Sequence, residues 1–195
     1  MRINPNGRIP AIVDHDNDNF SVWESGAILL YLVQTYDKNY ALWSPDPKIQ
    51  SQITSWLCFQ VSGHSVMQGQ AVYFKYFARE KSPAATARYI NETRRVYGVL
   101  EMALAEQREM ISNKDSQNTS PAPEIDGDDE DDKAVWLVDQ RCTIADLSFL
   151  TWSKVADRVD IIVEEEYPEV SRWINNMINR RAVQRALIGC DDDNL

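Results

Sequence analysis

The chain has 195 residues, 44% of them hydrophobic, which is enough to bury a core in one domain or in two small ones. Its net charge is −10, but nine of the negative charges lie in two runs, at 126–132 and 191–193. The remainder is close to neutral and lacks the basic face typical of nucleic-acid binding. No apolar run approaches the roughly 18–20 residues of a membrane span, and the start lacks the apolar segment of a signal peptide, so we expect a soluble, cytoplasmic protein without a membrane or nucleic-acid partner.

Cysteine and histidine usage argues against a metal site. The three cysteines, Cys58, Cys142 and Cys190, form no CxxC pair, and an odd number does not suit a disulfide framework. Cys58 and Cys142 lie within apolar stretches, so we expect both to be buried. His15 and His64 have no neighbouring ligand residues in the sequence.

The first forty residues predict a strand, a second strand and a helix. Alternation at 10–14 and at 20–23 is typical of strands, and the polar cluster at 16–19 predicts the turn of a hairpin. Helical spacing follows from Ala27 to Tyr36.

From residue 46 onward every predicted element is a helix. Asp46-Pro47 opens a long helix that runs to Tyr73, with a bend expected near Gly63 or Gly69.

Ser82-Pro83 opens a second long helix, predicted at 83–109, with charged residues on a solvated face. That face comprises Arg94, Arg95, Glu101 and Glu106.

The stretch at about 112–133 is polar, acidic and proline-bearing, so we expect a flexible insert there. Three more helices are predicted, at 143–158, 168–179 and 182–189. These patterns divide the chain into a unit at 1–40 and a helical domain at 46–190.

Three short stretches carry the functional signals. Ile9-Pro10 precedes a strand: a cis bond there would expose the Ile9 backbone for pairing with an extended peptide, although most such pairs are ordinary trans loop residues. Glu24-Ser25-Gly26 opens a helix, whose free N–H groups could bind a carboxylate beside the Ser25 hydroxyl while Glu24 holds an ammonium; the alternative is that Glu24 and Ser25 simply cap the helix.

The third stretch, Thr143-Ile144-Ala145-Asp146, is a capping box. We expect Asp146 to be structural rather than catalytic.

In this order and spacing, "NPNGRIPAIVD", "WESGAILLYL" and "TIADLSF" resemble the glutathione transferase superfamily over essentially the whole chain. "RRVYGVLEMALAE", "VWLV" and the insert before "VWLV" resemble the transferase-like regulators of nitrogen catabolite repression in yeasts; bacterial nu-class transferases are similar but lack the insert. The resemblance implies an α/β remnant of a thioredoxin-like domain, strand-strand-helix, followed by an all-α transferase C-terminal domain.

The resemblance also implies glutathione as co-substrate, with no metal. In the family, the residue matching Ile9 pairs through its backbone with the cysteinyl unit beside a cis Pro10. Glu24 and Ser25 match the pair that holds the γ-glutamyl end, and Arg8 lies where a side chain reaches toward the glycyl end.

A homodimer is implied as well, through the helices at 47–77 and 83–109. Arg88 matches an arginine that, in nu-class dimers, reaches the glutathione bound to the other subunit.

In the family, a strand, a helix and a further strand precede the stretch matched here and carry the residue that contacts the glutathione sulfur. We therefore expect the catalytic residue to lie outside this sequence, with Met1 in mid-domain and the strand at 11–14 lacking a neighbour on one edge. An incomplete gene model or truncated start is one explanation. A real short protein, held together by its helical domain or a partner, is the other.

Three functions remain open. The first is a glutathione transferase, or a glutathione-dependent peroxide or disulfide reductase, in the complete form. The second is a non-catalytic regulator of nitrogen catabolite repression that sequesters a transcription factor. The third is a helical interaction module that has lost the site.

Overall fold

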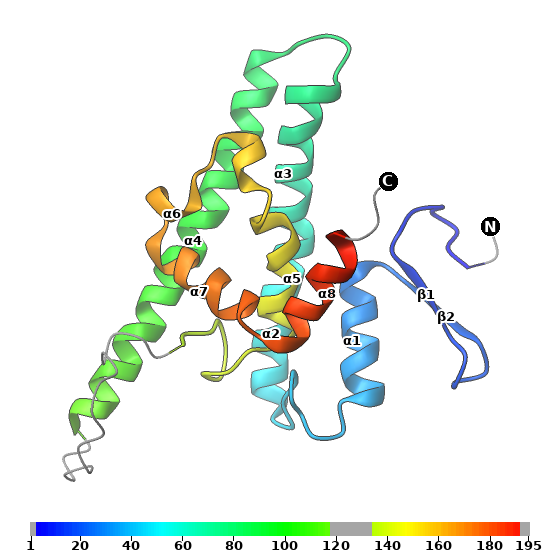
Figure 1. Cartoon of the computed structure of the whole chain (residues 1–195), viewed down its shortest axis with the longest axis vertical. Helices are drawn as coiled ribbons and strands as arrows, with labels where there is room; N and C mark the ends of the chain where they lie inside the picture. The colour runs from blue at the N-terminus through cyan, green and yellow to red at the C-terminus, as the bar shows by residue number, and fades with distance from the viewer. Residues whose placement is uncertain (1–2, 118–133, 192–195) are drawn as a thin grey trace.

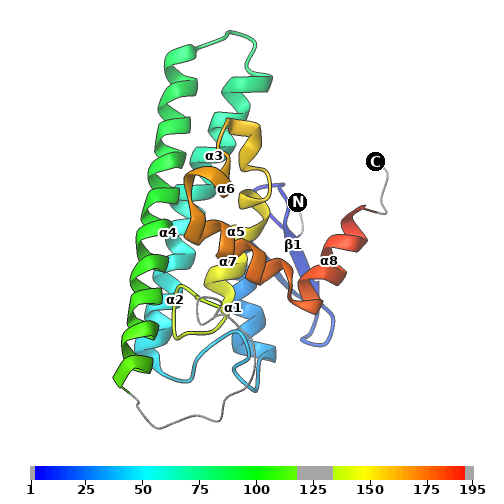
Figure 2. The ribbon, with the colours of Figure 1, turned by 60° about the vertical axis from the view of Figure 1, so that its left-hand side comes forward.

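The computed structural model describes residues 3–117 and 134–191. A two-stranded hairpin and one helix lie beside a larger, entirely helical part (Figure 1). Figure 2 shows the same arrangement from another side, with the hairpin and the long helix α4 at opposite sides of the molecule. The predicted fold class, a strand-strand-helix unit followed by an all-α domain, is confirmed.

The hairpin consists of β1 (Ala11–Asp14) and β2 (Phe20–Trp23), paired antiparallel with Ala11 opposite Trp23 and Asp14 opposite Phe20. Asp18 and Asn19 in the turn have φ angles of 52° and 58°, a conformation that short polar side chains tolerate. The hairpin leads directly into α1 (Ser25–Tyr36).

The turn of the hairpin is fastened to the far end of α1. The Asp14 carboxylate accepts hydrogen bonds from the Tyr31 hydroxyl, at 2.5 Å, and from the Tyr36 hydroxyl. These hydrogen bonds hold the pKa of Asp14 below its ordinary value, and the bond from Tyr31 makes the largest contribution. The Asn17 amide adds a bond to the Tyr31 hydroxyl, at 2.8 Å.

The long helix predicted from residue 47 contains two π-helical segments. It consists of α2 (Pro47–Phe59), η1 (Gln60–His64), α3 (Ser65–Val72) and η2 (Tyr73–Phe77). Gly63 lies within η1, whereas the second π-helical segment begins beyond Gly69, and the bend expected near one of these glycines stays a prediction. The side chains that this helix buries follow three- and four-residue steps at its centre: Ile53, Leu57, Gln60, His64 and Gln68.

α4 (Pro83–Gln117) packs antiparallel against α3 and buries Thr93, Val96, Tyr97, Leu100 and Leu104. It continues beyond the predicted end at residue 109, so the first six residues of the expected insert, 112–117, are helical. That polar stretch contains no proline or glycine, and a helix already formed propagates through such residues at little cost. The remainder of the expected insert, 118–133, lies outside the described residues.

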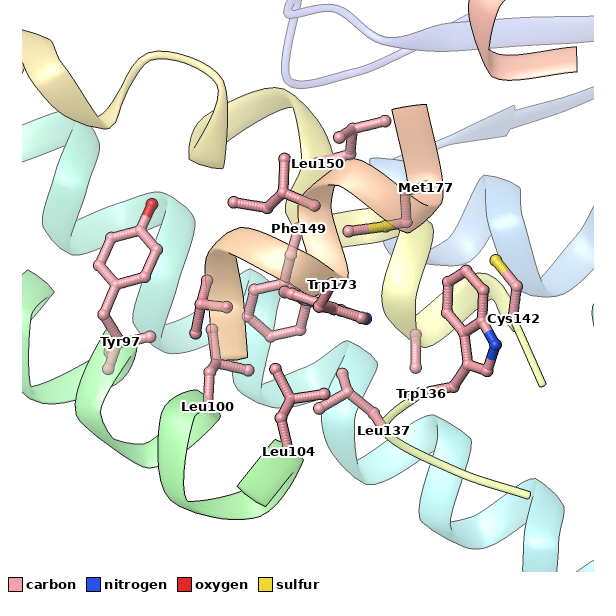
Figure 3. Packing of buried hydrophobic residues seen from close by; sticks show 14 of the residues in the cluster. Tyr97, Leu100, Leu104, Trp136, Leu137, Cys142, Phe149, Leu150, Trp173 and Met177 are labelled. Atoms are coloured by element: carbon pink, nitrogen blue, oxygen red, sulfur yellow. The ribbon is translucent and has the colours of Figure 1, made fainter. Parts of the chain in front are cut away.

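The remaining helices close the core. α5 (Ile144–Ser153) is followed by the 3₁₀ turn η4 (Ala156–Val159), so the helix predicted at 143–158 is divided. α6 (Val163–Glu166), α7 (Pro168–Ile178) and α8 (Arg181–Asp191) follow. Figure 3 shows Phe149 of α5 and Trp173 of α7 meeting side chains of α4, and the two rings lie 5.7 Å apart between centroids.

Asp146 is the polar centre of this core and is fully buried. Its carboxylate accepts the Thr143 N–H at 2.7 Å and the Thr143 hydroxyl at 3.0 Å, and it also accepts the Leu137 N–H at 3.0 Å and the Trp173 indole N–H at 2.9 Å. The predicted capping box is confirmed. Burial raises the pKa of Asp146 above its ordinary value, and the four hydrogen bonds oppose that rise.

Two sequence-based expectations about side chains are wrong. Cys58 is exposed, because it lies one position beyond the buried Leu57 and off the buried face of α2, whereas Cys142 is buried as expected. Glu101 is not a solvated charge: its carboxylate accepts the N–H groups of Glu169 and Val170, at 3.1 and 3.0 Å, and so caps the start of α7 from another helix.

Candidate functional site

The register of the hairpin brings two of the predicted site segments to one end. Because Ala11 pairs with Trp23, Pro10 and Glu24 are the next residues on the two strands, at the open end of the hairpin. The loop that contains Arg8, Ile9 and Pro10 therefore lies beside the start of α1. The turn with the Asp14 cluster is at the opposite end.

The loop at 4–10 presents Ile9 to solvent. This residue is 95% exposed, and the Ile9–Pro10 bond is cis. None of the described residues hydrogen-bonds to the backbone N–H or C=O of Ile9. Asn4 lies beneath the loop and is only 6% exposed, and its amide donates to the Arg8 C=O at 2.7 Å. Sequence reasoning did not identify Asn4, since its role depends on the folded turn.

The start of α1 is an open helix N-terminus. Glu24 occupies the N-cap position with φ 72° and ψ 125°, and its side chain makes no capping hydrogen bond within the described chain. The first intrahelical bond runs from the Ile28 N–H to the Glu24 C=O, at 2.9 Å, which leaves the earlier N–H groups without helical partners. Ser25 follows as the first helical residue, exposed beside those groups. The alternative expectation, that Glu24 caps this helix with its side chain, is not met.

A largely apolar pocket of about 460 Å³ extends from this end of the hairpin toward the helical part. Pro10 and Ser25 line it on one side, and Gln60 of η1 and Trp152 of α5 line it on the other. Gly26 allows the close approach of α1 to η1, because a Cβ there would lie 3.2 Å from Cγ2 of Val61.

Arg88 is not part of this group. It is exposed on α4, where it lines a separate pocket with Asn91, Glu92 and Arg95. Hydrogen bonding to Arg95, with a smaller contribution from the charge of Arg88, lowers the pKa of Glu92. Within one chain, the structure thus brings together Arg8, Ile9, Pro10, Glu24 and Ser25, and it places Arg88 elsewhere.

Within the described ranges, no three His, Cys, Asp or Glu side chains gather in a group that could hold a metal ion. None of the helices in residues 3–117 and 134–191 is both long enough and apolar enough to cross a membrane.

Comparison with known proteins gives a consistent assignment. The family model described as "Glutathione S-transferase, N-terminal domain" matches residues 1–34, and "Glutathione S-transferase, C-terminal domain" matches residues 66–181. The chain is 51% identical to Protein URE2 of Meyerozyma guilliermondii, over 97% of this chain and 65% of that protein. It is 49% identical to the Transcriptional regulator URE2 of Saccharomyces cerevisiae, over 97% of this chain and 56% of that protein. The chain therefore spans somewhat more than half the length of these relatives.

Solved structures agree. "Ure2p in Complex with Glutathione" superposes with a TM-score of 0.84 at 48% identity, over 95% of this chain and 77% of that one. The glutathione transferase URE2P6 from Phanerochaete chrysosporium, in complex with oxidized glutathione, superposes with a TM-score of 0.80 at 35% identity, over 96% and 75% of the two chains. A hairpin with an open helix start, a helical domain built around a capping box, and these matches lead to one conclusion: the chain belongs to the glutathione S-transferase family.

Proposed function

We propose that this chain binds glutathione at the open end of the hairpin, and that the start of α1 is the anchor. The observation that carries the proposal is a set of polar groups at this end that have no hydrogen-bond partner within the described residues. They are the first N–H groups of α1, the Ser25 hydroxyl, the Glu24 carboxylate and the backbone N–H and C=O of Ile9. Supporting it, two structurally similar relatives are described as complexes with glutathione or oxidized glutathione.

The γ-glutamyl end of glutathione is a zwitterion, and the start of α1 offers a partner for each of its charges. A carboxylate is stabilised at a helix N-terminus by free N–H groups and by the positive end of the helix dipole, and the Ser25 hydroxyl adds a donor. The Glu24 carboxylate, left free of any capping role, would pair with the ammonium.

The peptide part of glutathione would lie along the loop. An extended peptide pairs with exposed backbone groups as an added strand, and Ile9 offers one N–H and one C=O for this purpose. Arg8, exposed beside Ile9, would reach toward the glycyl carboxylate. These contacts hold the backbone and ends of the tripeptide and leave its thiol to other groups.

For the complete protein we propose transferase chemistry, or glutathione-dependent reduction of a peroxide or disulfide. Both reactions begin with the thiolate of glutathione, whose formation requires donors near the sulfur that lower the pKa of the thiol. The residues that we assign, Arg8, Ile9, Pro10, Glu24 and Ser25, bind and orient. We assign none of them a catalytic role.

The test is isothermal titration of the full chain with glutathione and with S-hexylglutathione. Replacing Ser25 by alanine removes a hydrogen bond to a charged group, worth about 1.5–3 kcal/mol, so the affinity should fall about ten-fold or more. Ser55→Ala is the matched control, since Ser55 is exposed and its hydroxyl bonds only within its own helix, to the Ser51 C=O. Absence of binding by the unmodified chain would refute the proposal, and equal affinities of Ser25→Ala and the unmodified chain would remove Ser25 from the site.

We also propose that two copies associate through α2, α3 and α4 and that Arg88 of one copy lies toward the glutathione of the other. Large apolar residues exposed on these helices support it, among them Val66 of α3 (47%) and Met102 of α4 (61%). Sedimentation equilibrium measures the association directly. A monomer at all concentrations would exclude the role of Arg88.

A second candidate function is regulation by sequestration of a transcription factor in the cytoplasm. The observation that favours it is the 49% identity to a protein named a transcriptional regulator. Its test is co-purification of a zinc-finger transcription factor with the chain, compared between the unmodified chain and Ser25→Ala. Retention of the factor by both, without turnover of peroxide, would favour the regulator over the enzyme.

A further inference from the structure

Beneath the loop that carries Ile9 lies the only polar side chain buried within the described part of the hairpin unit, that of Asn4. It is 6% exposed, and its side-chain hydrogen bonds within residues 3–117 and 134–191 all go to the backbone of its own loop: Nδ2 donates to the Arg8 C=O at 2.7 Å, and Oδ1 accepts the Asn6 N–H at 2.8 Å. The Asn4 C=O also accepts the Gly7 N–H, at 3.1 Å, where the chain turns with φ 66°. Both ends of the amide are thus engaged within five residues of Ile9.

The two partners fix which way the amide points. A carbonyl can only accept and a backbone N–H can only donate, so Nδ2 faces Arg8 and Oδ1 faces Asn6. Asn4 therefore supplies a donor that holds the Arg8 C=O inward.

Peptide geometry carries this constraint to Ile9. The Arg8–Ile9 bond is not among the cis bonds of the structure, and in a planar trans peptide the C=O and the following N–H point in opposite directions. Because Asn4 turns the Arg8 C=O inward, the Ile9 N–H must face outward. The next residue, Pro10, has no N–H, so the Ile9 N–H is the one backbone donor at this position of the loop.

From this geometry we propose that Asn4 is a positioning residue for peptide-ligand binding: it aims the Ile9 N–H at a backbone carbonyl of the ligand. The inference rests on the proposed binding of glutathione and adds to it a residue that does not touch the ligand. A donor held in its bound orientation gains affinity because less conformational freedom is lost on binding.

Asn4→Asp is the decisive variant. The side chain keeps its shape and its acceptor for the Asn6 N–H, but an oxygen replaces the donor opposite the Arg8 C=O. The peptide is then free to rotate, and the affinity for glutathione should fall about ten-fold. Asn6→Ala is the control, because Asn6 lies exposed in the same loop and contributes its backbone N–H to the bond with Asn4.

The NMR signal of the Ile9 amide distinguishes a positioning role of Asn4 from a merely structural one, because only a positioning role changes how this signal responds to ligand. In the unmodified chain, saturation with glutathione should shift the Ile9 ¹⁵N–¹H signal downfield and slow its hydrogen exchange. In Asn4→Asp, that shift should shrink while the signals of α1 still respond to ligand through Ser25. An Ile9 amide in the unmodified chain that neither shifts nor gains protection overturns the inference, whatever the variant does to folding.

The two proposals fail separately. If the unmodified chain does not bind glutathione, both the binding proposal and the positioning role of Asn4 are refuted. If it binds, depends on Ser25 and is indifferent to Asn4→Asp, with the loop signals of the variant intact, glutathione binding stands and the role of Asn4 is refuted.

Discussion

The helices α1 and α5 each have an acidic residue at or near the N-cap, and these two carboxylates have opposite surroundings. At the start of α5, Asp146 is fully buried and accepts four hydrogen bonds from three residues. At the start of α1, Glu24 is exposed, has a positive φ and makes no capping bond within the described chain. A carboxylate that accepts hydrogen bonds from groups within the protein stabilises the fold. A carboxylate without such bonds, beside N–H groups that also lack a partner, is available to a ligand.

The same contrast separates the two ends of the hairpin. At the turn, the Asp14 carboxylate is engaged by two tyrosine hydroxyls and fastens the strands to α1. At the open end, the backbone N–H and C=O of Ile9, the Glu24 carboxylate and the Ser25 hydroxyl find no partner within residues 3–117 and 134–191. The polar groups that bond within the described protein therefore have structural roles, and those without such partners are the groups that we propose to bind a ligand.

The largest expected effect is that of Asp146→Ala. Several buried donors would lose their acceptor, and each unsatisfied group costs about 1–3 kcal/mol, so the free energy of unfolding should fall by about 3 kcal/mol or more. Urea unfolding followed by tryptophan fluorescence measures this. Ser25→Ala at the other helix start should leave the urea midpoint unchanged; a large shift there, or none in Asp146→Ala, would break the contrast between the two termini.

The next effect comes from His64, which is fully buried between the Tyr97 and Phe149 rings. Burial lowers its pKa from 6.5 to about 4. The unfolded chain therefore binds a proton that the folded chain does not between pH 6.5 and about 4, so stability is lost as the pH falls through this window. One pKa unit corresponds to about 1.4 kcal/mol, which makes the total about 3 kcal/mol.

The measurement is the free energy of unfolding from pH 7 to pH 4, compared between the unmodified chain and His64→Gln. Other titrating groups contribute equally to both chains, so the difference in slope isolates the imidazole. The groups that face the ring, the Tyr97 hydroxyl at 3.2 Å and Gln68, do not titrate in this range. Parallel curves would show that His64 is protonated as readily in the folded protein as in the unfolded chain.

The smallest expected effect is that of Arg88→Ala. This substitution tests whether a second copy of the chain contributes Arg88 to the proposed glutathione site at the open end of the hairpin. An exposed ion pair is worth about 0.2–1 kcal/mol, so glutathione affinity should fall by about 1.4- to five-fold at protein concentrations where dimers form. Arg95→Ala is the control, since Arg95 lies on the same helix and pairs with Glu92 at 2.7 Å. An effect of Arg88→Ala that persists in the monomer would mean that Arg88 does not act across an interface.

The sequence by itself determined the elements that begin with local signals. The hairpin at 11–23, the helix starts at 25, 47 and 83, and the capping box at Thr143 and Asp146 all follow from alternation, turn residues, prolines and N-caps. The interactions behind these patterns join residues within one helical turn or across one tight turn, so the local sequence contains all the residues that take part in them. Local signals also singled out Ile9, Pro10, Glu24 and Ser25, the register of the hairpin brings them to one end of it, and their role in binding stays a prediction.

Only the tertiary structure decided which side chains are buried or hydrogen-bonded within the described protein and which are exposed. Glu101 is a cap for α7, although 69 residues separate it from Val170. Cys58 is exposed because of which face of α2 meets the core, and Asn4 is buried because the loop folds over it. The partners in these cases come from a folded turn or from a distant element, and the energy of a polar group depends on those partners rather than on its neighbours in the chain.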